Sequence, residues 1–555
     1  MNRKVLFLTF LISLMITAAS LPVAAEEAGA TGKGIAVLYT SDVHCGVDQG
    51  FGYEGLWQIR QTMEEEGYAT ILVDDGDSVQ GEAIGTLTRG EAVIGLMNQM
   101  GYDAAIPGNH EFDYGTDQFL RLADMAAFPY ISCNFTKNGE LVFEPYKIVE
   151  AAGKKIAFVG VTTPMTFTTS TPTYFQDENG SFIYGFMQDE TGQKLYDAVQ
   201  SAVDSARKEG ADYVYVLAHL GLEDTCSPWT YADVISHTSG IDVFLDGHSH
   251  DTEQVVMKNR DGRNVTRSAV GTKLNCIGRS IIHAEDGTIE TDILSWPNSE
   301  SAPRLLDMDN EMTAAVDAAF KELDDEMNTV VARSDVELII NDPEETDLSG
   351  NPIRMVRRAE TNLGDLCADA LREATGADIA ILNGGGIRSG IGRGDITMGD
   401  ILNVFPYNNT LCVVEATGQQ ILDALEWGAR NVPDENGAFL QVSGLSYEID
   451  STVDSGCRSD ENGMCTGIEG DRRVKKVRVG DEELDPGKTY SLAGGSYILI
   501  DRGDGFTFFE NAPVLNDLDL IDHQALIDYL SGTLGGTVGE AYADPFGQGR
   551  ITVKE

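Results

Sequence analysis

Five short apolar segments in the first half of the sequence are each followed by residues of the types that bind metal ions. The segments alternate with longer stretches compatible with helices, a pattern typical of an α/β domain whose strands are buried by helices. The segments, each with the polar residues behind it, are 35–39 with Asp42 and His44, 70–73 with Asp77, 102–106 with Asn109, His110 and Asp113, 213–217 with His219, and 242–245 with His248 and His250. We expect these strand ends to converge in space.

The shared position of these residues separates a metal centre from ordinary turn chemistry. A single aspartate after a strand is usually a turn residue, and a single histidine is more often structural than metal-bound. Five of the chain's eight histidines, however, lie behind such segments, which independent turns would rarely produce. The sequence therefore predicts a metal site at the strand ends.

The predicted ligands are oxygen and imidazole donors without clustered thiolates, which suits Zn²⁺, Mn²⁺, Fe or similar divalent ions. Gly76 permits a tight turn, so that Asp77 can supply a bridging carboxylate. Two ions about 3.5–4 Å apart lower the pKa of a bridging water and neutralise charge on a phosphoryl group. We therefore expect two divalent metal ions and hydrolysis by attack of a metal-bound hydroxide, with no covalent enzyme intermediate.

At 555 residues the chain is too long for one ordinary core, so we expect at least two domains. The first α/β pattern covers 34–304. An amphipathic helix is predicted over 305–331, where apolar residues recur at helical spacing, and it is the candidate linker. A second α/β pattern covers 332–555, with strands near 336–340, 379–382 and 411–415 and a helix near 418–429.

Residues 1–25 have the layout of a signal peptide, with basic residues at Arg3 and Lys4, an apolar stretch over 5–16 and a small-residue end at 23–25. The alternative is a membrane anchor, but the uncharged run is at the short limit for a span. We expect a secreted, periplasmic or cell-surface protein with no stable membrane insertion after the signal is removed.

The charge balance bears on the partners. Asp and Glu number 89 against 39 Lys and Arg, for a formal net charge of −50, which argues against a surface that binds a nucleic-acid polymer. We interpret the acidity as that of a soluble exterior. The eight cysteines do not form a disulfide scaffold in a chain of this length, but the small polar loop between Cys457 and Cys465 favours a disulfide in an oxidising compartment.

The order of the motifs resembles two known domains. Asp42-x-His44, Gly76-Asp77, the motif at 108–111, His219 and the motif at 247–250 resemble the calcineurin-like metallophosphoesterase signature. The segments 360–364, 383–388, 394–397 and 503–506 are similar to the second domain of the 5′-nucleotidase family, of the bacterial secreted 5′-nucleotidase and 2′,3′-cyclic-nucleotide 2′-phosphodiesterase type. The resemblance implies an N-terminal four-layer α/β/β/α sandwich, a linking helix and a C-terminal α/β substrate-binding domain.

The resemblance also implies roles for the strand-end residues. Asp77 would bridge two metal ions, and His110 with Asp113 would form the catalytic pair, in which the carboxylate orients the imidazole. The implied metal ligands are Asp42, His44, Asp77 and His250 at one site, and Asp77, Asn109, His219 and His248 at the other.

The resemblance further implies that the second domain holds the nucleoside and rotates about the linking helix. The expected substrate residues are Arg357, Asn383, Gly385, Arg388, Tyr407, Asn409, Tyr497 and Asp504. The sequence departs from the family at one wall of the base site, where Ile498 replaces the usual aromatic residue, Tyr497 stands one position earlier and Arg502 replaces a glycine. Ordinary packing is the alternative interpretation of Tyr407 and Tyr497.

Together these features favour hydrolysis of nucleoside 5′-monophosphates. Related substrates are 2′,3′-cyclic nucleotides, nucleoside di- or triphosphates and UDP-sugars. A second enzyme hypothesis is a relative that hydrolyses a sulfur-linked or non-nucleotide ester. A hypothesis from another class is a secreted nucleotide-binding protein whose catalytic site has decayed, which the occupation of every expected ligand position disfavours.

Overall fold

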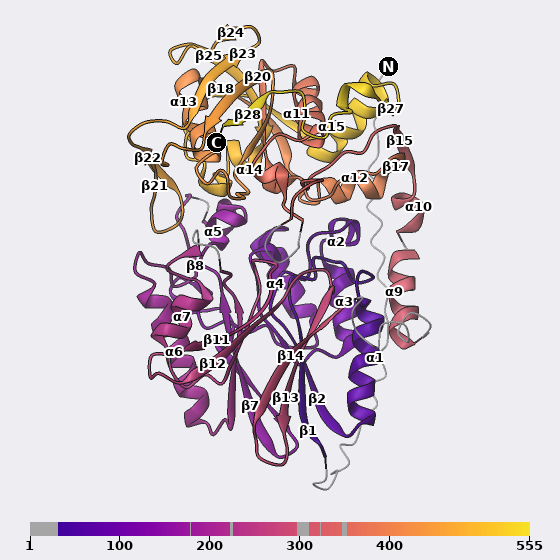
Figure 1. Cartoon of the computed structure of the whole chain (residues 1–555), viewed down its shortest axis with the longest axis vertical. Helices are drawn as coiled ribbons and strands as arrows, with labels where there is room; N and C mark the ends of the chain where they lie inside the picture. Colours follow the sequence, from indigo (N-terminus) through magenta and orange to yellow (C-terminus); the bar gives the residue numbers. More distant parts are fainter. Residues whose placement is uncertain are drawn as a thin grey trace.

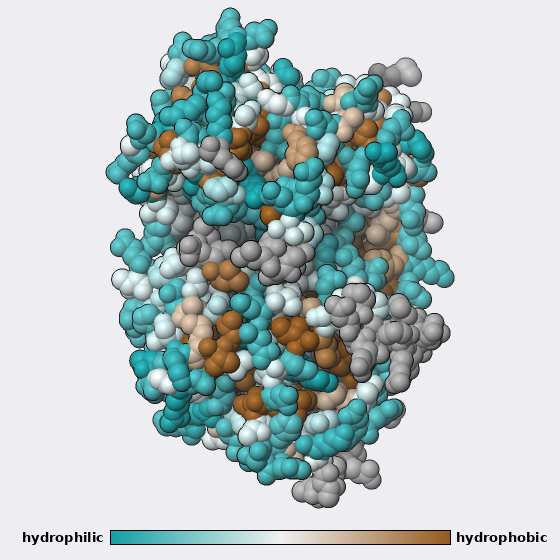
Figure 2. All heavy atoms as spheres, in the orientation of Figure 1, coloured by the Kyte–Doolittle hydropathy of each residue, from teal (hydrophilic) through white to brown (hydrophobic). Residues whose placement is uncertain are grey.

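The computed structural model describes residues 32–554 apart from 178, 223–225, 297–309, 322 and 347–351. The chain folds into two α/β bodies, a lower one coloured indigo to magenta and an upper one coloured mainly orange to yellow in Figure 1. Hydrophilic side chains cover most of the face shown in Figure 2. The predicted signal peptide lies outside the described residues. Within the described part of the chain, no helix is long and apolar enough to cross a membrane.

The first sheet of the lower body consists of β1 (Gly34–Thr40), β2 (Tyr68–Asp74), β3 (Ala104–Ala105), β13 (Cys276–His283) and β14 (Ile289–Ser295). Its strand order is β14-β13-β1-β2-β3. β1, β2 and β3 run parallel, whereas β13 is antiparallel to β1. The carboxyl ends of three parallel strands therefore lie at one edge of this sheet.

The second sheet consists of β6 (Tyr146–Ala151), β7 (Lys154–Thr162), β9 (Tyr213–His219), β10 (Val243–Asp246), β11 (Thr252–Lys258) and β12 (Asn264–Val270). Its order is β11-β12-β10-β9-β7-β6. β7, β9, β10 and β12 run parallel, and β11 and β6 are antiparallel edge strands.

Helices cover the outer faces of both sheets. Along β1, Leu38 packs in the cluster shared with the helices, whereas Val37 and Tyr39 pack between the two sheets. This alternation is the two-residue period of a strand with both faces buried. The covering helices are α1 (Gly52–Glu65), α3 (Glu91–Met100) and α4 (Thr116–Met125) on the first sheet, and α6 (Gln193–Lys208) and α7 (Tyr231–His237) on the second. The predicted four-layer α/β/β/α sandwich is confirmed.

Shorter elements join these layers, and α2, α5 and β8 among them lie toward the upper body in Figure 1. They are α2 (Ala83–Thr88), the one-turn helix η1 (His110–Phe112), β4 (Thr136–Lys137), β5 (Glu140–Leu141), α5 (Thr166–Thr169), η2 (Pro172–Phe175) and β8 (Tyr184–Gly185).

The segment between the bodies contains α9 (Glu311–Lys321) and α10 (Asp324–Met327). Met312 and Val316 of α9 are buried in the cluster that includes α1 and α3. Residues 305–309 and 322 of the amphipathic helix expected over 305–331 lie outside the described residues, and the described part of this range contains the two helices α9 and α10. Its last residues, the β-branched Val330 and Val331, already belong to β15 (Val330–Ser334).

The main sheet of the upper body consists of β16 (Ile379–Asn383), β18 (Thr410–Thr417), β19 (Leu440–Ser443), β25 (Thr489–Gly495) and β26 (Val514–Ile521), in the order β19-β16-β25-β18-β26. One face packs against α11 (Asn362–Thr375), α12 (Met398–Val404) and α15 (Asp522–Asp528), and the other against α13 (Gly418–Gly428). The C-terminal domain is therefore an α/β domain, as expected.

Smaller sheets flank this core. Their strands are β17 (Gly394–Thr397), β20 (Leu445–Asp450), β21 (Cys457–Ser459), β22 (Cys465–Ile468), β23 (Val474–Val479), β24 (Glu482–Glu483), β27 (Thr537–Val538) and β28 (Ile551–Lys554). The remaining helices include η4 (Met355–Arg357), η5 (Gly384–Gly386), α14 (Ser496–Leu499) and η6 (Gly503–Gly505).

Two expectations for the upper body are wrong. Residues 336–340 form no strand and make a single bridge, between Leu338 and Ile391, because their apolar residues pack in the core without a partner strand. The disulfide is not formed, since Cys457 and Cys465 are both free. In the β21–β22 hairpin Cys457 lies opposite Ile468 and Cys465 opposite Ser459, so the register does not pair the two cysteines. The strands expected at 379–382 and 411–415 and the helix at 418–429 are confirmed as β16, β18 and α13.

Candidate metal centre and substrate cleft

The strand ends that carry the predicted metal ligands meet at one place. β1, β2 and β3 lead to Asp42 and His44, to Asp77, and to Asn109 and His110, while β9 ends at His219 and β10 leads to His248 and His250. Because β1, β2 and β3 are parallel in the first sheet, and β9 and β10 are parallel in the second, the carboxyl ends of each set share an edge of their own sheet. The structure brings possible metal ligands together in three groups, and within each group the ligand atoms lie no more than 4.8 Å apart. The groups are Asp42, His44 and His250; His44, Asp77 and His110; and Asp77, His219 and His248.

Two glycines allow the turns to approach closely. Gly76 has a φ of +93°, and a Cβ there would lie 2.6 Å from the backbone nitrogen of Gly108. A Cβ on Gly108 would lie 2.2 Å from Oδ1 of Asp77. Side chains at either position would therefore push the second and third strand-end turns apart.

Hydrogen bonds to carbonyl groups fix the orientation of two imidazoles. Nδ1 of His44 lies 2.9 Å from the carbonyl oxygen of Gln80, and Nδ1 of His219 lies 2.8 Å from that of Asp75. A carbonyl can only accept, so each Nδ1 donates, and in the neutral ring each Nε2 then presents a lone pair to the centre.

The centre as described fits divalent cations. Nε2 of His219 is buried and lies 2.9 Å from Oδ2 of Asp77. Nε2 of His44 lies 3.0 Å from Nε2 of His250, and Oδ1 of Asn109 lies 2.8 Å from Nδ1 of His248. Carboxylate, amide and imidazole donors converging in a buried space are a ligand set for Zn²⁺, Mn²⁺ or Fe.

Burial and charge set the protonation of these groups. Burial lowers the pKa of His44 and of His250 well below the usual value, which keeps both rings neutral and able to bind a metal. Burial also acts to lower the pKa of His219, but the charges of Asp77 and Asp42 outweigh it and raise that pKa. The carboxylates therefore attract positive charge to the position that a cation would take.

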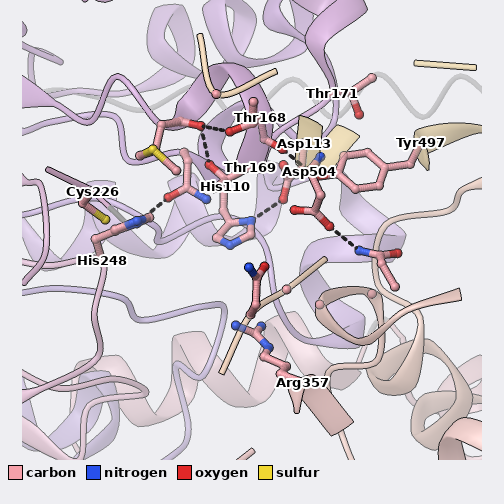
Figure 3. Close-up of a pocket in the computed structure, with 18 of the residues that line it drawn as sticks. His110, Asp113, Thr168, Thr169, Thr171, Cys226, His248, Arg357, Tyr497 and Asp504 are labelled. Atoms are coloured by element: carbon pink, nitrogen blue, oxygen red, sulfur yellow. Dashed lines mark hydrogen bonds and ion pairs between the residues drawn. The ribbon is translucent and has the colours of Figure 1, made fainter. Parts of the chain in front are cut away.

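His110 and Asp113 form a pair at the edge of the centre. Nδ1 of His110 lies 2.5 Å from Oδ2 of Asp113, an interaction marked by a dashed line in Figure 3. The backbone nitrogen of His110 donates to Oδ1 of Asp77 over 2.8 Å. Both residues belong to the turn around η1. The bond to Asp113 occupies Nδ1 and leaves Nε2 of His110 available to a ligand.

A cleft between the two bodies opens onto this centre. Its volume is about 1150 Å³, and residues from both bodies line it. In Figure 3, His110, Asp113 and His248 of the lower body and Arg357, Tyr497 and Asp504 of the upper body surround the same space. All of the predicted substrate residues line it: Arg357, Asn383, Gly385, Arg388, Tyr407, Asn409, Tyr497 and Asp504.

The aromatic residues of the cleft have distinct surroundings. The ring of Tyr407 lies 6.0 Å from that of His110, and the guanidinium of Arg388 lies 5.9 Å from the Tyr407 ring. The hydroxyl of Tyr497 donates to the carbonyl of Thr168 over 2.8 Å. Ile498, by contrast, is 1% exposed and packs in the core of the upper body. Tyr497 is thus the one of the two neighbours that faces the cleft.

Sequence reasoning missed several residues of the site. Arg430 lines the cleft and stacks on Trp427 at 3.9 Å, but an arginine after a helix gives no recognisable signal. Glu111 accepts hydrogen bonds from the backbone nitrogens of Asp77, Ser78 and Gly108 over 2.6–2.8 Å and so holds two of the turns together. Its position beside His110 is the signal that could have identified it.

Comparisons with known proteins agree with this architecture. Residues 35–252 match the calcineurin-like phosphoesterase family, and residues 330–511 match the C-terminal domain of 5′-nucleotidases. The trifunctional nucleotide phosphoesterase YfkN of Bacillus subtilis is 31% identical over 93% of this chain, which spans only 35% of that relative. The 5′-nucleotidase of Vibrio parahaemolyticus is 26% identical over 96% of this chain and 95% of its own length.

A solved structure extends the likeness to the fold. The 5′-nucleotidase precursor from Thermus thermophilus superposes with a TM-score of 0.75 at 26% identity, covering 94% of this chain and 99% of the other. Both family matches lie in the bodies that the structure separates, in the same order. The chain therefore belongs to the calcineurin-like phosphoesterases that carry a C-terminal 5′-nucleotidase domain.

Proposed function

We propose that this protein is a metal-dependent phosphoesterase that releases phosphate from nucleotides, foremost nucleoside 5′-monophosphates. One observation carries the proposal. A single cleft has the strand-end ligand cluster and the His110–Asp113 pair on one wall, and the arginines, tyrosines and Asp504 of the upper body on the other. The cleft thus joins a place for phosphoryl transfer to a place for a nucleoside.

We assign two divalent cations to the centre. Asp42, His44 and His250 would hold one, Asn109, His219 and His248 the other, and Asp77 would bridge them. When bound, such a pair supplies a nucleophilic water at neutral pH and stabilises negative charge on the phosphoryl group. The ring nitrogens of His44 and His219 are held ready for this by the carbonyls of Gln80 and Asp75.

His110 is the proposed acid at the leaving oxygen. With Nδ1 bound to Asp113, the Nε2–H of the protonated ring can donate to the ester oxygen or stabilise the charge that develops on it. His110 also belongs to one of the groups of possible metal ligands, with His44 and Asp77. A variant that loses activity but keeps its metals separates these two roles.

Two arginines are suited to the phosphate group. Arg357 and Arg388 line the cleft, and neither makes an ion pair in the part of the chain that the structure describes. Burial, reinforced by Arg354 and Arg388, lowers the pKa of Arg357 to about 9. An anion in the cleft would offset the repulsion between Arg357 and the two neighbouring arginines, which supports phosphate recognition here.

The nucleoside would lie beside the tyrosines. We infer that Tyr407 and Tyr497 contact the base and that Asp504 accepts hydrogen bonds from the ribose. The side-chain nitrogen of Asn383 donates to Oδ2 of Asp504 over 2.9 Å, which orients the carboxylate. This arrangement favours nucleotides over simple phosphate esters.

The test begins with protein stripped of metal by a chelator. Phosphate release is measured after adding Mn²⁺ or Zn²⁺ singly, from adenosine 5′-monophosphate, a 2′,3′-cyclic nucleotide, a nucleoside diphosphate, a UDP-sugar and a non-nucleoside phosphate ester. We expect no turnover without metal and the highest kcat/KM with a nucleoside monophosphate. Asp77→Asn should depress turnover strongly. A preference for the non-nucleoside ester would contradict the proposal.

We also propose export, which rests on the signal-peptide pattern of residues 1–25. In the source organism, mass spectrometry of the cell-free or envelope fraction should find a chain that begins near Glu26. Recovery of the full-length chain from the cytosol alone would contradict this.

A further inference from the structure

A fully buried arginine lies beneath the loop that carries His248 and His250. Arg267 is 0% exposed and projects from β12, which lies between β11 and β10 in the second sheet. Arginine is seldom fully buried unless it is paired, and an apolar residue is usual at such a position. Its contacts therefore indicate what it contributes.

The loop arches over the end of β12. β10 ends at Asp246 and β11 begins at Thr252, and β12 lies between these two strands. Leu245 of β10 pairs with Ser268, and Thr252 of β11 pairs with Val270. Residues 247–251 must consequently cross above β12, with Arg267 below the crossing.

The guanidinium binds both ends of this loop. Its Nε and Nη2 donate to Oδ2 of Asp246 over 3.2 and 2.8 Å, at the start of the loop. Its Nη2 donates to Oδ1 of Asp251 over 2.9 Å, and Nη1 donates to the other oxygen of Asp251, at the end of the loop. The ring of Tyr231 lies 4.3 Å from the guanidinium carbon. Two carboxylates and a planar fork thus close the loop at its base.

Through Asp246, the same arginine is also connected to the segment that follows His219. Oδ1 of Asp246 accepts from the backbone nitrogen of Leu220 over 3.0 Å and from that of Gly221 over 3.4 Å. One buried carboxylate therefore connects Arg267 to the strand end that follows β9. Three of the proposed metal ligands, His219, His248 and His250, share this support.

The free energy of folding does not explain why Arg267 is buried with two carboxylates. Burying an ion pair costs desolvation free energy that offsets most of its electrostatic attraction, so buried pairs contribute little net stability and can be replaced by apolar residues. The loop also holds His248 at a φ of 81° and His250 at 56°, conformations that L-residues rarely adopt. A strained loop needs rigid ends if its side chains are to stay in place.

We propose that Arg267 is a positioning residue for the metal centre, which clamps Asp246 and Asp251 and thereby places His219, His248 and His250. The proposal rests on the metal ligands of the proposed function. According to this proposal, Arg267 increases the affinity of the centre for metal ions by a measurable amount. It does so indirectly, because its guanidinium pairs with carboxylates that are not themselves proposed ligands.

The experiment measures Mn²⁺ binding by titration calorimetry on the metal-free full chain, without nucleotide. Arg267→Met should raise the Mn²⁺ dissociation constant about 10- to 100-fold, the usual effect of removing a group that orients metal ligands. Arg267→Lys keeps the charge but not the fork, and should lie between this variant and the wild type. At saturating Mn²⁺, KM for the nucleotide should stay within about twofold of the wild-type value, because Arg267 does not face the substrate.

The matched control lies at the opposite end of β10. Nη2 of Arg207 donates to Oδ2 of Asp242 over 2.6 Å, just before the strand begins. Arg207→Met should lower the melting temperature and leave Mn²⁺ affinity unchanged. Wild-type Mn²⁺ affinity in Arg267→Met, or an equal loss in both variants, would overturn the proposal.

Two further outcomes keep the test decisive. If Arg267→Met does not fold, Asp251→Asn removes one end of the clamp, and unchanged Mn²⁺ affinity in that variant would overturn the proposal. If the wild-type chain binds no Mn²⁺ while it is folded, the proposed metal centre itself fails. Tight wild-type binding with unaffected variants rejects the clamp alone.

Discussion

Several side chains at the metal centre stand on a left-handed backbone. The φ angles are 50° at Asp42, 47° at His44 and 59° at Asp77. An L-residue in this region costs roughly 1 kcal/mol, and the backbone here is held by bonds from Asp42 to Gly76 and from His44 to Asp77, both 2.9 Å long. The turns therefore accept strain to direct their side chains inward, which is common at functional sites.

This strain predicts an unusual order of stability. His44→Gly and His44→Ala both remove the ring, but only glycine accepts a φ of 47° without cost. In chelator, we expect His44→Gly to unfold with a free energy about 1 kcal/mol higher than His44→Ala. Denaturant titration measures the difference. At the exposed Ser201 within α6 the order should reverse, because alanine favours a helix. Equal stability of the two His44 variants would contradict the argument.

His110 offers the residue-scale test of chemistry. His110→Ala should lower kcat on the order of 10² or more while the metals stay bound, because it removes a proton donor and not a ligand. Steady-state kinetics and metal analysis of the same sample measure both quantities. Asp113→Asn is the companion variant, since it keeps the shape of the partner but weakens its bond to Nδ1. Loss of metal from His110→Ala would move His110 into the ligand set.

At the scale of elements, strand ends and helix starts place the proposed substrate residues as well. The side-chain nitrogen of Asn409, just before β18, lies 3.3 Å from Oδ2 of Asp522, the first residue of α15. Asp522 is 2% exposed, and burial raises its pKa to about 7. The position of Asn409, a proposed substrate residue, thus depends on the protonation of the Asp522 carboxyl group at the start of α15.

This coupling predicts a pH dependence of stability. Because the folded-state pKa of Asp522 is raised, its protonated form stabilises the fold fully below about pH 4, and this contribution is lost as the pH rises through about 7. Asp522→Asn carries no group that ionises here, so its stability does not fall in this way as the pH rises. The difference in unfolding free energy between this variant and the wild type should therefore increase from pH 4 to pH 8 in favour of the variant, by up to about 4 kcal/mol. Urea titrations across this range measure it. Asp528→Asn, exposed on the same helix, should show no such trend.

The sequence specified some elements better than others, for physical reasons. Asp42, Asp77 and His219 could be placed because apolar runs followed by ligand-type residues report strand ends directly. Residues 336–340 could not, because burial gives the same pattern with or without a partner strand. Arg267 gave no signal, since its carboxylate partners lie 16 and 21 positions away in the chain and only the sheet order brings them together.

At the scale of the whole molecule, the cleft is closed from both sides by bonds between the bodies. On one side, the backbone nitrogen of Ala83 donates to Oδ1 of Asn403 over 2.7 Å. On the other, the hydroxyl of Tyr497 donates to Thr168, and the side-chain nitrogen of Gln188 lies 3.1 Å from Oδ1 of Asn462, near the tip of the β21–β22 hairpin. A nucleotide held between the bodies would leave more readily if the bodies moved apart.

The hairpin tip offers a way to test that movement. A Cβ on Gly463 would lie 3.7 Å from Cβ of Thr168 across the cleft, within the range that a disulfide spans. In the double variant Thr168→Cys with Gly463→Cys, oxidation should join the bodies and reduction should release them. If turnover requires a rotation between domains, kcat should fall about tenfold or more on oxidation and recover with reductant.

Because one sample is compared with itself, any strain from a side chain at residue 463, whose φ is +77°, affects both states. Mass spectrometry verifies the cross-link, which matters because Cys457 and Cys465 lie in the same hairpin. Full turnover by the cross-linked protein would show that catalysis and release proceed with the bodies held as they are in Figure 1.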